Sequence, residues 1–125
     1  MNFGSLVATA AGGAIVLPTT GVRTGDAAIL AGPDGSPTAA EFTVNGEVDY
    51  TYAITLPAAP FNVSNSDTTP ATMEVGTFVS TPDATGVLAL GTQTLKVGAT
   101  ITLGVNQASG IYNNATDLAV TVYYN

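Results

Sequence analysis

Leu118-Ala119-Val120-Thr121-Val122-Tyr123-Tyr124-Asn125 closes the chain and indicates its fold. Large apolar residues occupy every second position, at 118, 120, 122 and 124, which is the period of a β-strand with one apolar face. Such a strand needs a cover over that face and a partner on each edge, because an open edge presents unpaired N–H and C=O groups. We therefore expect another strand of this chain, or a second molecule, to lie beside it.

Further segments with strand-like patterns are separated by clusters of turn residues. They cover residues 13–19, 27–31, 41–44, 47–56, 72–80, 87–90, 93–97 and 100–105. Loops are expected at 57–60, 62–70 and 106–116, where Pro, Asn, Ser, Thr and Asp accumulate.

Two local signals concern how these strands are joined. Asn45-Gly46 readily takes the positive φ angles of a type I′ turn, so it predicts a hairpin between 41–44 and 47–56. Gly98 separates two apolar alternations and predicts a kink between 93–97 and 100–105.

No segment has a convincing helical pattern. Thr38-Ala39-Ala40-Glu41 matches a capping box, but β-type alternation follows it. The chain is therefore predicted to be all-β, as one antiparallel β-sandwich domain over 1–125 of immunoglobulin-like or jelly-roll type. The predicted core consists of Phe42, Tyr50, Tyr52, Ile54, Leu95, Val97, Ile101 and Leu103.

The composition is poor in charge. The 125 residues include 9 acids but only 2 cations, Arg23 and Lys96, so the formal net charge is -7. Charged residues make up 9% of the chain, against roughly 25% in a typical soluble domain. A surface built of Thr, Ser, Asn, Gly and Ala does little to keep copies of a protein apart, because charge normally does so.

The same composition argues against several partners. Two cations cannot neutralise many phosphates, which argues against nucleic-acid binding and against docking on an anionic membrane. No run of about 18 apolar residues predicts membrane insertion. Residues 6–17 are apolar but lack the basic flank of a signal peptide, so we expect any leader of a secreted protein to lie upstream of Met1.

The sequence contains no recognisable set of catalytic residues. The chain contains no His and no Cys, which removes the commonest general base and the thiolate nucleophile. Lys96 alternates with apolar neighbours and is expected to face solvent. We predict that the protein is not an enzyme and that it needs no cofactor.

Two Asn-rich loops offer oxygen atoms that calcium could use. One holds Asn62, Asn65 and Asp67, and the other holds Asn113, Asn114 and Asp117. Since these residue types also favour turns, and carboxylates are few, we interpret them as turn residues and predict no metal site. Asn62 and Asn114 also begin glycosylation sequons.

Several stretches resemble the domain of unknown function 4402 family, whose members are small secreted bacterial β-domains. The stretches are Asn2-Phe3-Gly4, Glu41 to Gly46, Gly91 to Thr100, Gly110-Ile111-Tyr112 and Val120 to Tyr124. The family is similar in outline to pilins of the chaperone-usher type, and the closing strand with its penultimate Tyr124 resembles a pilin ending. The resemblance implies an immunoglobulin-like, pilin-like sandwich of about seven to eight strands that lacks one strand.

In such pilins the N-terminal extension of the next subunit fills the groove beside the last strand. This chain differs in having no Cys, where classical pilins commonly carry a disulfide, and in showing no evident donor extension before its domain-like pattern begins. The resemblance implies a secreted subunit of an extracellular, cell-surface filament of the pilus or fimbria type. It would polymerise with copies of itself by β-strand addition, with a periplasmic chaperone as a partner during assembly.

The residues predicted to carry this assembly lie at both ends of the chain. Leu118, Val120, Val122 and Tyr124 are predicted to line the groove. Phe3, Leu6 and Val7 are predicted to form an apolar N-terminal segment that packs in cis or in trans. The alternative is a monomeric surface adhesin that binds glycan or calcium through its Asn-rich loops.

Overall fold

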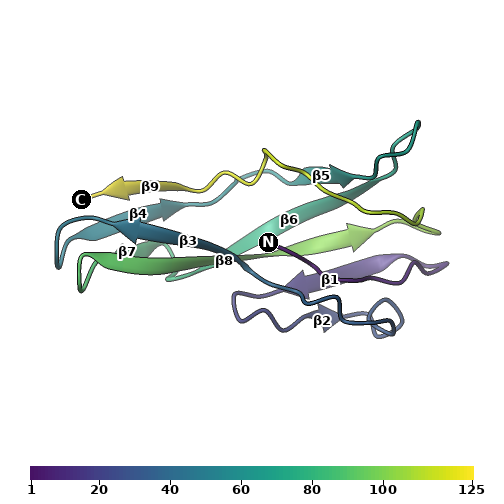
Figure 1. Cartoon of the computed structure of the whole chain (residues 1–125), viewed down its shortest axis with the longest axis horizontal. Helices are drawn as coiled ribbons and strands as arrows, with labels where there is room; N and C mark the ends of the chain where they lie inside the picture. Colours follow the sequence, from purple (N-terminus) through teal and green to yellow (C-terminus); the bar gives the residue numbers. More distant parts are fainter.

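The structure, a computed structural model, describes all residues 1–125 and contains only β-strands and loops. Figure 1 shows how the nine strands are arranged. They are β1 (Gly13–Leu17), β2 (Thr24–Gly25), β3 (Ala40–Asn45), β4 (Thr51–Thr55), β5 (Phe61–Ser64), β6 (Thr72–Thr81), β7 (Thr85–Val87), β8 (Thr92–Leu103) and β9 (Thr121–Tyr124). No helix is long and apolar enough to cross a membrane.

The larger sheet is built around the long strand β8. Its order is β2-β1-β8-β6-β5, and β3 also pairs with β8. β1 pairs with residues 99–103 of β8 and β3 with residues 92–97, so the two share one edge of β8 while β6 occupies the other. All of these pairings are antiparallel.

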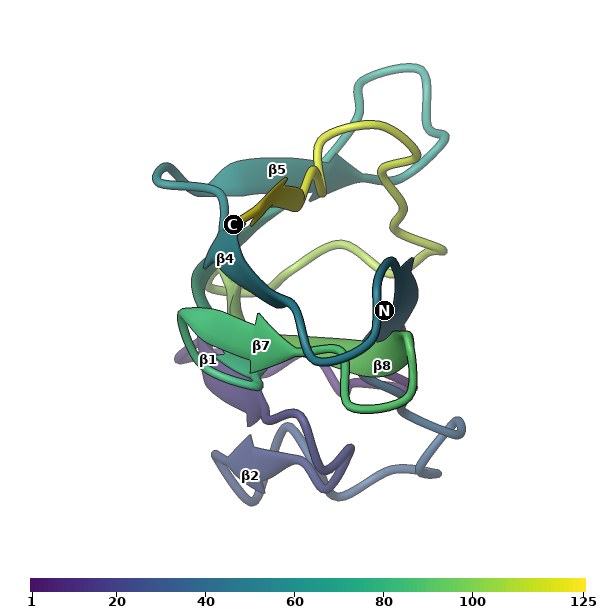
Figure 2. The same ribbon diagram turned by 90° about the vertical axis from the view of Figure 1, so that its left-hand side faces the viewer.

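The smaller sheet has the order β7-β4-β9 and faces the first half of β8 (Figures 1 and 2). Between the sheets lies one core cluster, made of Ala40, Val44, Tyr52, Leu88, Leu95 and Val97. A second cluster under the other half of β8 consists of Ile15, Ile29, Met73, Val75, Ala99, Ile101 and Leu103. This second cluster is covered by the N-terminal segment and by loops rather than by a sheet, as partly buried Phe3, Leu6 and Tyr112 pack on it.

The predicted all-β sandwich is confirmed, but the Asn45-Gly46 hairpin prediction is wrong. β3 pairs with β8, whereas β4 pairs with β7 and β9 in the other sheet. The connection 46–50 therefore crosses from one sheet to the other. The reason is burial: Val44 and Tyr52 both enter the core from opposite sheets, which a hairpin within one sheet would not allow.

The strands predicted at 93–97 and 100–105 form one strand, since β8 continues from 92 to 103 through Gly98 without interruption. Gly98 lies where β3 gives way to β1 along the edge of β8. A Cβ at this position would collide with the backbone carbonyl oxygen of Leu17. Glycine is thus needed at this position for a close backbone approach.

Two other segments differ from expectation. Residues 27–31 form a turn instead of a strand, because the Asp26 carboxylate accepts the N–H groups of Ala28 and Ile29 and the chain folds back locally. β5 falls within a region predicted to be loop, where Val63 and Phe61 pair with β6.

The core prediction is correct for Tyr52, Leu95, Val97, Ile101 and Leu103, all of which are buried. Ile54 is partly buried. Tyr50 is 56% exposed because it precedes β4 and no sheet covers it. Phe42 is also exposed, at 37%, but the cause of its exposure lies in the candidate site.

Candidate functional site

β9 is an edge strand with one unpaired margin. It pairs with β4 alone, with Ile54 opposite Val122 and Tyr52 opposite Tyr124. The N–H of Asn125 donates to the carbonyl of Thr51 at 3.0 Å. Because hydrogen-bonded and non-hydrogen-bonded pairs alternate in an antiparallel ladder, the backbone groups of Val122 and Tyr124 point away from β4, toward the free margin.

The inward side chains along this strand are covered only in part. Leu118, Val120 and Val122 pack against the core cluster between the sheets, yet each keeps part of its surface accessible. A strand with partners on both sides would bury such residues more completely. The last chain segment therefore has an apolar face that the core covers only in part and a backbone edge that no other strand pairs with.

Phe42 shows that the opposite margin is open as well. It lies on β3 directly opposite Leu95, so both side chains project from the same face of the sheet, toward the core. Leu95 is 1% exposed, whereas Phe42 is 37% exposed. The pattern of apolar residues was therefore read correctly, but the prediction that Phe42 is buried is wrong, because the space beside β3 lacks a covering strand.

One side chain joins these two margins. The Tyr124 hydroxyl donates to the backbone carbonyl of Asn45 at 2.7 Å. Its ring also lies over Gly46, where a Cβ would come within 3.2 Å of Tyr124 Cε1. Tyr124 is nevertheless 56% exposed, so the predicted groove-lining residue closes one end of the opening instead of entering the core.

Beneath Tyr124, the paired Tyr52 is completely buried. Its hydroxyl donates to Gln93 Oε1 at 2.9 Å, and the same oxygen accepts the N–H of Val87 at 2.9 Å. Burial raises the pKa of the Tyr52 phenol, and the nearby Tyr124 raises it further. Tyr52 therefore stays neutral and fixes β4 to the end of the larger sheet.

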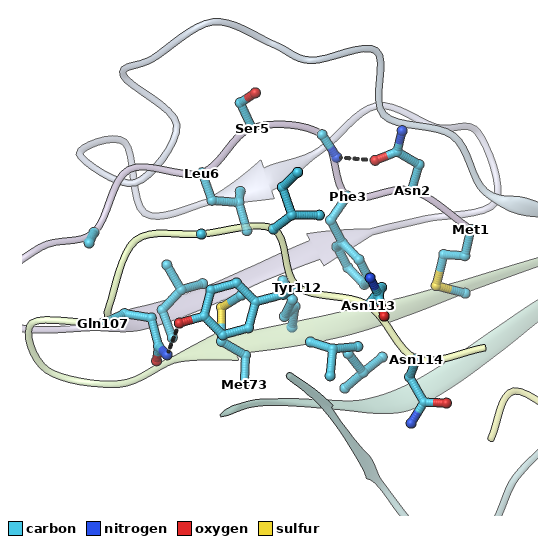
Figure 3. A pocket seen from close by; sticks show the side chains of 18 of the residues that line it. Met1, Asn2, Phe3, Ser5, Leu6, Met73, Gln107, Tyr112, Asn113 and Asn114 are labelled. Atoms are coloured by element: carbon cyan, nitrogen blue, oxygen red, sulfur yellow. Dashed lines mark hydrogen bonds between the residues drawn. The ribbon is translucent and has the colours of Figure 1, made fainter. Parts of the chain in front are cut away.

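A cavity of about 580 Å³ lies toward the other end of the sandwich. Figure 3 shows its apolar floor below the N-terminal segment, with Met73 among the floor residues and Tyr112 on the opposite wall. Val75, Ile101 and Leu103 also contribute to the floor. Met1 and Leu118 line this cavity and also pack on the core cluster between the sheets, so the cavity borders the opening beside β9.

The structure places the predicted N-terminal residues in different environments. Phe3 and Leu6 line the cavity and pack in cis on its core cluster. Val7 is 40% exposed and does not line the cavity. It instead lies against Gly32, and its N–H donates to the Ile29 carbonyl at 2.9 Å. Thus Phe3, Leu6 and Leu118 share one site, whereas Val120 and Val122 border the adjoining opening.

The wall formed by residues 107–114 was not anticipated from the sequence, where it reads as a polar turn region. The Tyr112 hydroxyl accepts a hydrogen bond from Gln107 Nε2 at 2.9 Å and donates to the Ala108 carbonyl at 2.6 Å. These bonds hold the aromatic ring over the core cluster. The sequence signal that could have indicated this wall is Tyr112, an aromatic residue inside a polar loop.

The two Asn-rich loops lie side by side. Ser64 and Asn113 form a bridge, and Asn114 Nδ2 donates to the Asn62 carbonyl and to Asp117 Oδ2, both at 2.8 Å. In the first loop Asn65 Oδ1 accepts the N–H of Ala71 at 2.8 Å. Among the residues considered for calcium, Asn65 and Asn114 thus use their side chains to bond neighbouring loop groups, and no three acidic residues gather in one place.

These features define a class of protein: a two-sheet antiparallel β-sandwich with a terminal edge strand that has one partner, and with an apolar cavity under the other half of the sandwich. The chain belongs to the family described as Domain of unknown function (DUF4402), whose sequence model matches residues 1–124. Neither a curated protein nor a solved structure gave a significant match.

Proposed function

We propose that this protein is a non-enzymatic structural subunit of an extracellular filament, and that copies assemble by adding a β-strand at the free margin of β9. The added strand would lie in the opening between β9 and β3. Its backbone would pair with the outward-pointing groups of Val122 and Tyr124, and its inward side chains would cover Phe42 and Val120.

The observation that carries this proposal is the exposure of Phe42, an inward-facing residue opposite a fully buried partner. A sandwich with one vacant strand position would present an exposed inward aromatic residue on one margin and incompletely buried valines on the other. Each large apolar side chain that becomes buried in the new interface, from either partner, would contribute roughly 1.5–3 kcal/mol to the free energy of association before ordering costs.

The margin also lacks the usual protection against strand addition. Natural edges are blunted by Lys, Pro or inward charges, whereas residues 118–125 contain no charged side chain and no Pro. Residues 40–45 of β3 carry one acidic residue, Glu41. Its Oε1 forms an ion pair with Lys96 Nζ at 2.8 Å on the outer face of the sheet. A protein selected to remain monomeric would be expected to defend such margins.

Secretion to the cell surface, and a periplasmic chaperone that shields the margin before assembly, belong to the same proposal. The composition is compatible with an extracellular role, because two basic residues leave few sites for trypsin-like proteases. The family itself carries no described activity.

The test compares two lysine substitutions on the same strand. Phe42→Lys places a charge on the inward face, where the partial exposure of the site lets the ammonium reach water and the fold survive. Thr43→Lys makes the same charge change on the outer face of β3. Sedimentation and electron microscopy should show assembly of the wild type and Thr43→Lys but not of Phe42→Lys.

A wild-type protein that stays monomeric at high concentration would overturn the proposal. Equal assembly by the two variants would also overturn it, because contact would then not involve the opening. Circular dichroism of each variant verifies that the fold is retained.

A further inference from the structure

The N-terminal segment is attached to the rest of the molecule in a one-sided way. Its backbone bonds run from Asn2 to Thr38, from Ser5 to Asp34 and from Val7 to Ile29. No hydrogen bond joins residues 1–8 to the opposite cavity wall at 107–114. The segment, here called the N-terminal strap (residues 1–8), therefore covers the cavity floor while being held from one side only.

Arg23 is the main side-chain attachment of the N-terminal strap. One guanidinium nitrogen, Nη1, donates to the carbonyls of Phe3 at 2.8 Å and Ser5 at 2.6 Å. The other, Nη2, pairs with Asp34 Oδ1 at 2.6 Å. The Arg23 side chain is 4% exposed, which is exceptional burial for a charged residue. The contacts of Nη1 and Nη2 replace their hydration, whereas the buried Nε has no hydrogen-bond partner.

The segments to which the strap is hydrogen-bonded contain little regular secondary structure. Between β1 and β3 the only strand is β2, which has two residues. Thr9, which follows the strap, accepts the N–H of Asn106 in the loop after β8 at 3.0 Å, so the chain is fixed immediately beyond the strap. Local opening is cheapest where buried contacts and regular ladders are few, and the segments that bind the strap contain few ladder hydrogen bonds.

We propose that the N-terminal strap is a releasable cover of the apolar floor, and that Arg23 holds it in the closed position. Release would extend the opening beside β9 into the cavity and expose Met73, Val75 and Ile101 along its floor. The link to assembly rests on the proposed function, whereas the release itself does not.

The natural absence of Cys makes a thiol reporter unambiguous. Met73→Cys places a thiol on the floor under the strap, and Leu95→Cys places one in the core cluster between the sheets. Each reporter is introduced into Arg23→Met and Lys96→Met backgrounds. The two backgrounds lose the same charge, but Lys96 belongs to an exposed ion pair with Glu41, with side chains 46% and 59% exposed.

Labelling with a disulfide reagent at low protein concentration should be at least tenfold faster for Met73→Cys with Arg23→Met than with Lys96→Met. Labelling of Leu95→Cys should be the same in both backgrounds. Amide exchange of Ser5 and Val7 should accelerate in parallel with the floor thiol. Asp34→Asn keeps the guanidinium and its contacts to the Phe3 and Ser5 carbonyls, so it should increase the labelling rate of the floor thiol by a smaller factor. This variant replaces Arg23→Met in the comparison if Arg23→Met does not fold.

Equal floor labelling in the two backgrounds would overturn the inference. Equal acceleration of both thiols would also overturn it, because the molecule would then be opening globally. These outcomes are independent of the assembly test, since labelling measures single molecules and the Phe42→Lys comparison measures association.

Discussion

The Tyr124 hydroxyl donates a 2.7 Å hydrogen bond to the carbonyl of Asn45, 79 residues earlier in the chain. This bond joins the free margins of β9 and β3 at one end of the sandwich, although the two strands belong to different sheets. It thereby sets where the opening between the sheets ends.

Tyr124→Phe removes this bond and keeps the ring. Because the group is partly exposed, the loss in the free energy of unfolding should be about 0.5–1 kcal/mol. Tyr123→Phe is the matched control, since Tyr123 is 61% exposed and its hydroxyl makes no hydrogen bond within the chain. Urea denaturation measures both variants, and an equal effect of the two would show that the Asn45 contact contributes nothing.

Tyr52 should make stability depend on alkaline pH. Burial raises the pKa of its phenol above the ordinary value near 10, so the folded state retains a proton that the unfolded state releases. The contribution is fully present below about pH 10 and decreases as the pH rises from there through the folded-state pKa. The wild type should therefore lose more stability than Tyr52→Phe as the pH is raised above about 10.

The comparison with Tyr52→Phe isolates this residue from the other four tyrosines. At neutral pH the variant should be less stable by about 1 kcal/mol, because its hydrogen bond to Gln93 is lost while Gln93 keeps the Val87 N–H as a partner. Parallel stability curves for the two proteins would contradict the assignment.

Gly98→Ala should be strongly destabilising. The new methyl group would collide with the Leu17 carbonyl at the place where β1 and β3 meet along β8, and backbone cannot move aside as a side chain can. We expect a loss of about 2–4 kcal/mol, in the range of overpacked or strained core sites.

Gly104→Ala is the control for this substitution, because a Cβ there would meet only the Gln107 side chain at 3.2 Å. Its effect should stay within about 0.5 kcal/mol. Thermal and urea denaturation compare the two variants. A tolerated Gly98→Ala would mean that the backbones of β1 and β8 are farther apart than described.

Salt should promote association if copies assemble as proposed. Both cations are already engaged within the chain, in the Arg23–Asp34 and Lys96–Glu41 pairs, so nine acids less two paired acids leaves seven uncompensated. Copies therefore repel each other at long range, and screening shortens that repulsion. Sedimentation should show more assembly at about 0.5 M than at about 0.02 M NaCl, where the Debye length is several times longer.

The alternation of apolar residues was sufficient to predict an all-β chain and most of its strands. Val120 and Val122 were correctly placed on the inner face of the last strand, and Leu95, Val97 and Ile101 in the core. This works because the side-chain period of a strand is local: each residue's face follows from its neighbours in the sequence.

Which strands pair with each other could not be predicted in the same way. Asn45-Gly46 has the chemistry of a tight hairpin, yet the connection crosses between sheets, because burial of Val44 and Tyr52 from opposite sides outweighs the local turn preference. The cavity likewise depends on Arg23, which bonds to the distant Phe3, and on Tyr112, whose hydroxyl bonds locally but whose ring packs on core residues from distant strands.

The sequence by itself thus determined which residues form strands, which faces are apolar, and that charge is nearly absent from the terminal strand. Only the tertiary structure decided that β9 has one partner, that Phe42 faces inward without cover, and that the N-terminal strap lies over an apolar floor. The physical reason is that periodicity is a property of consecutive residues, whereas edges, openings and burial arise from packing between segments far apart in the chain.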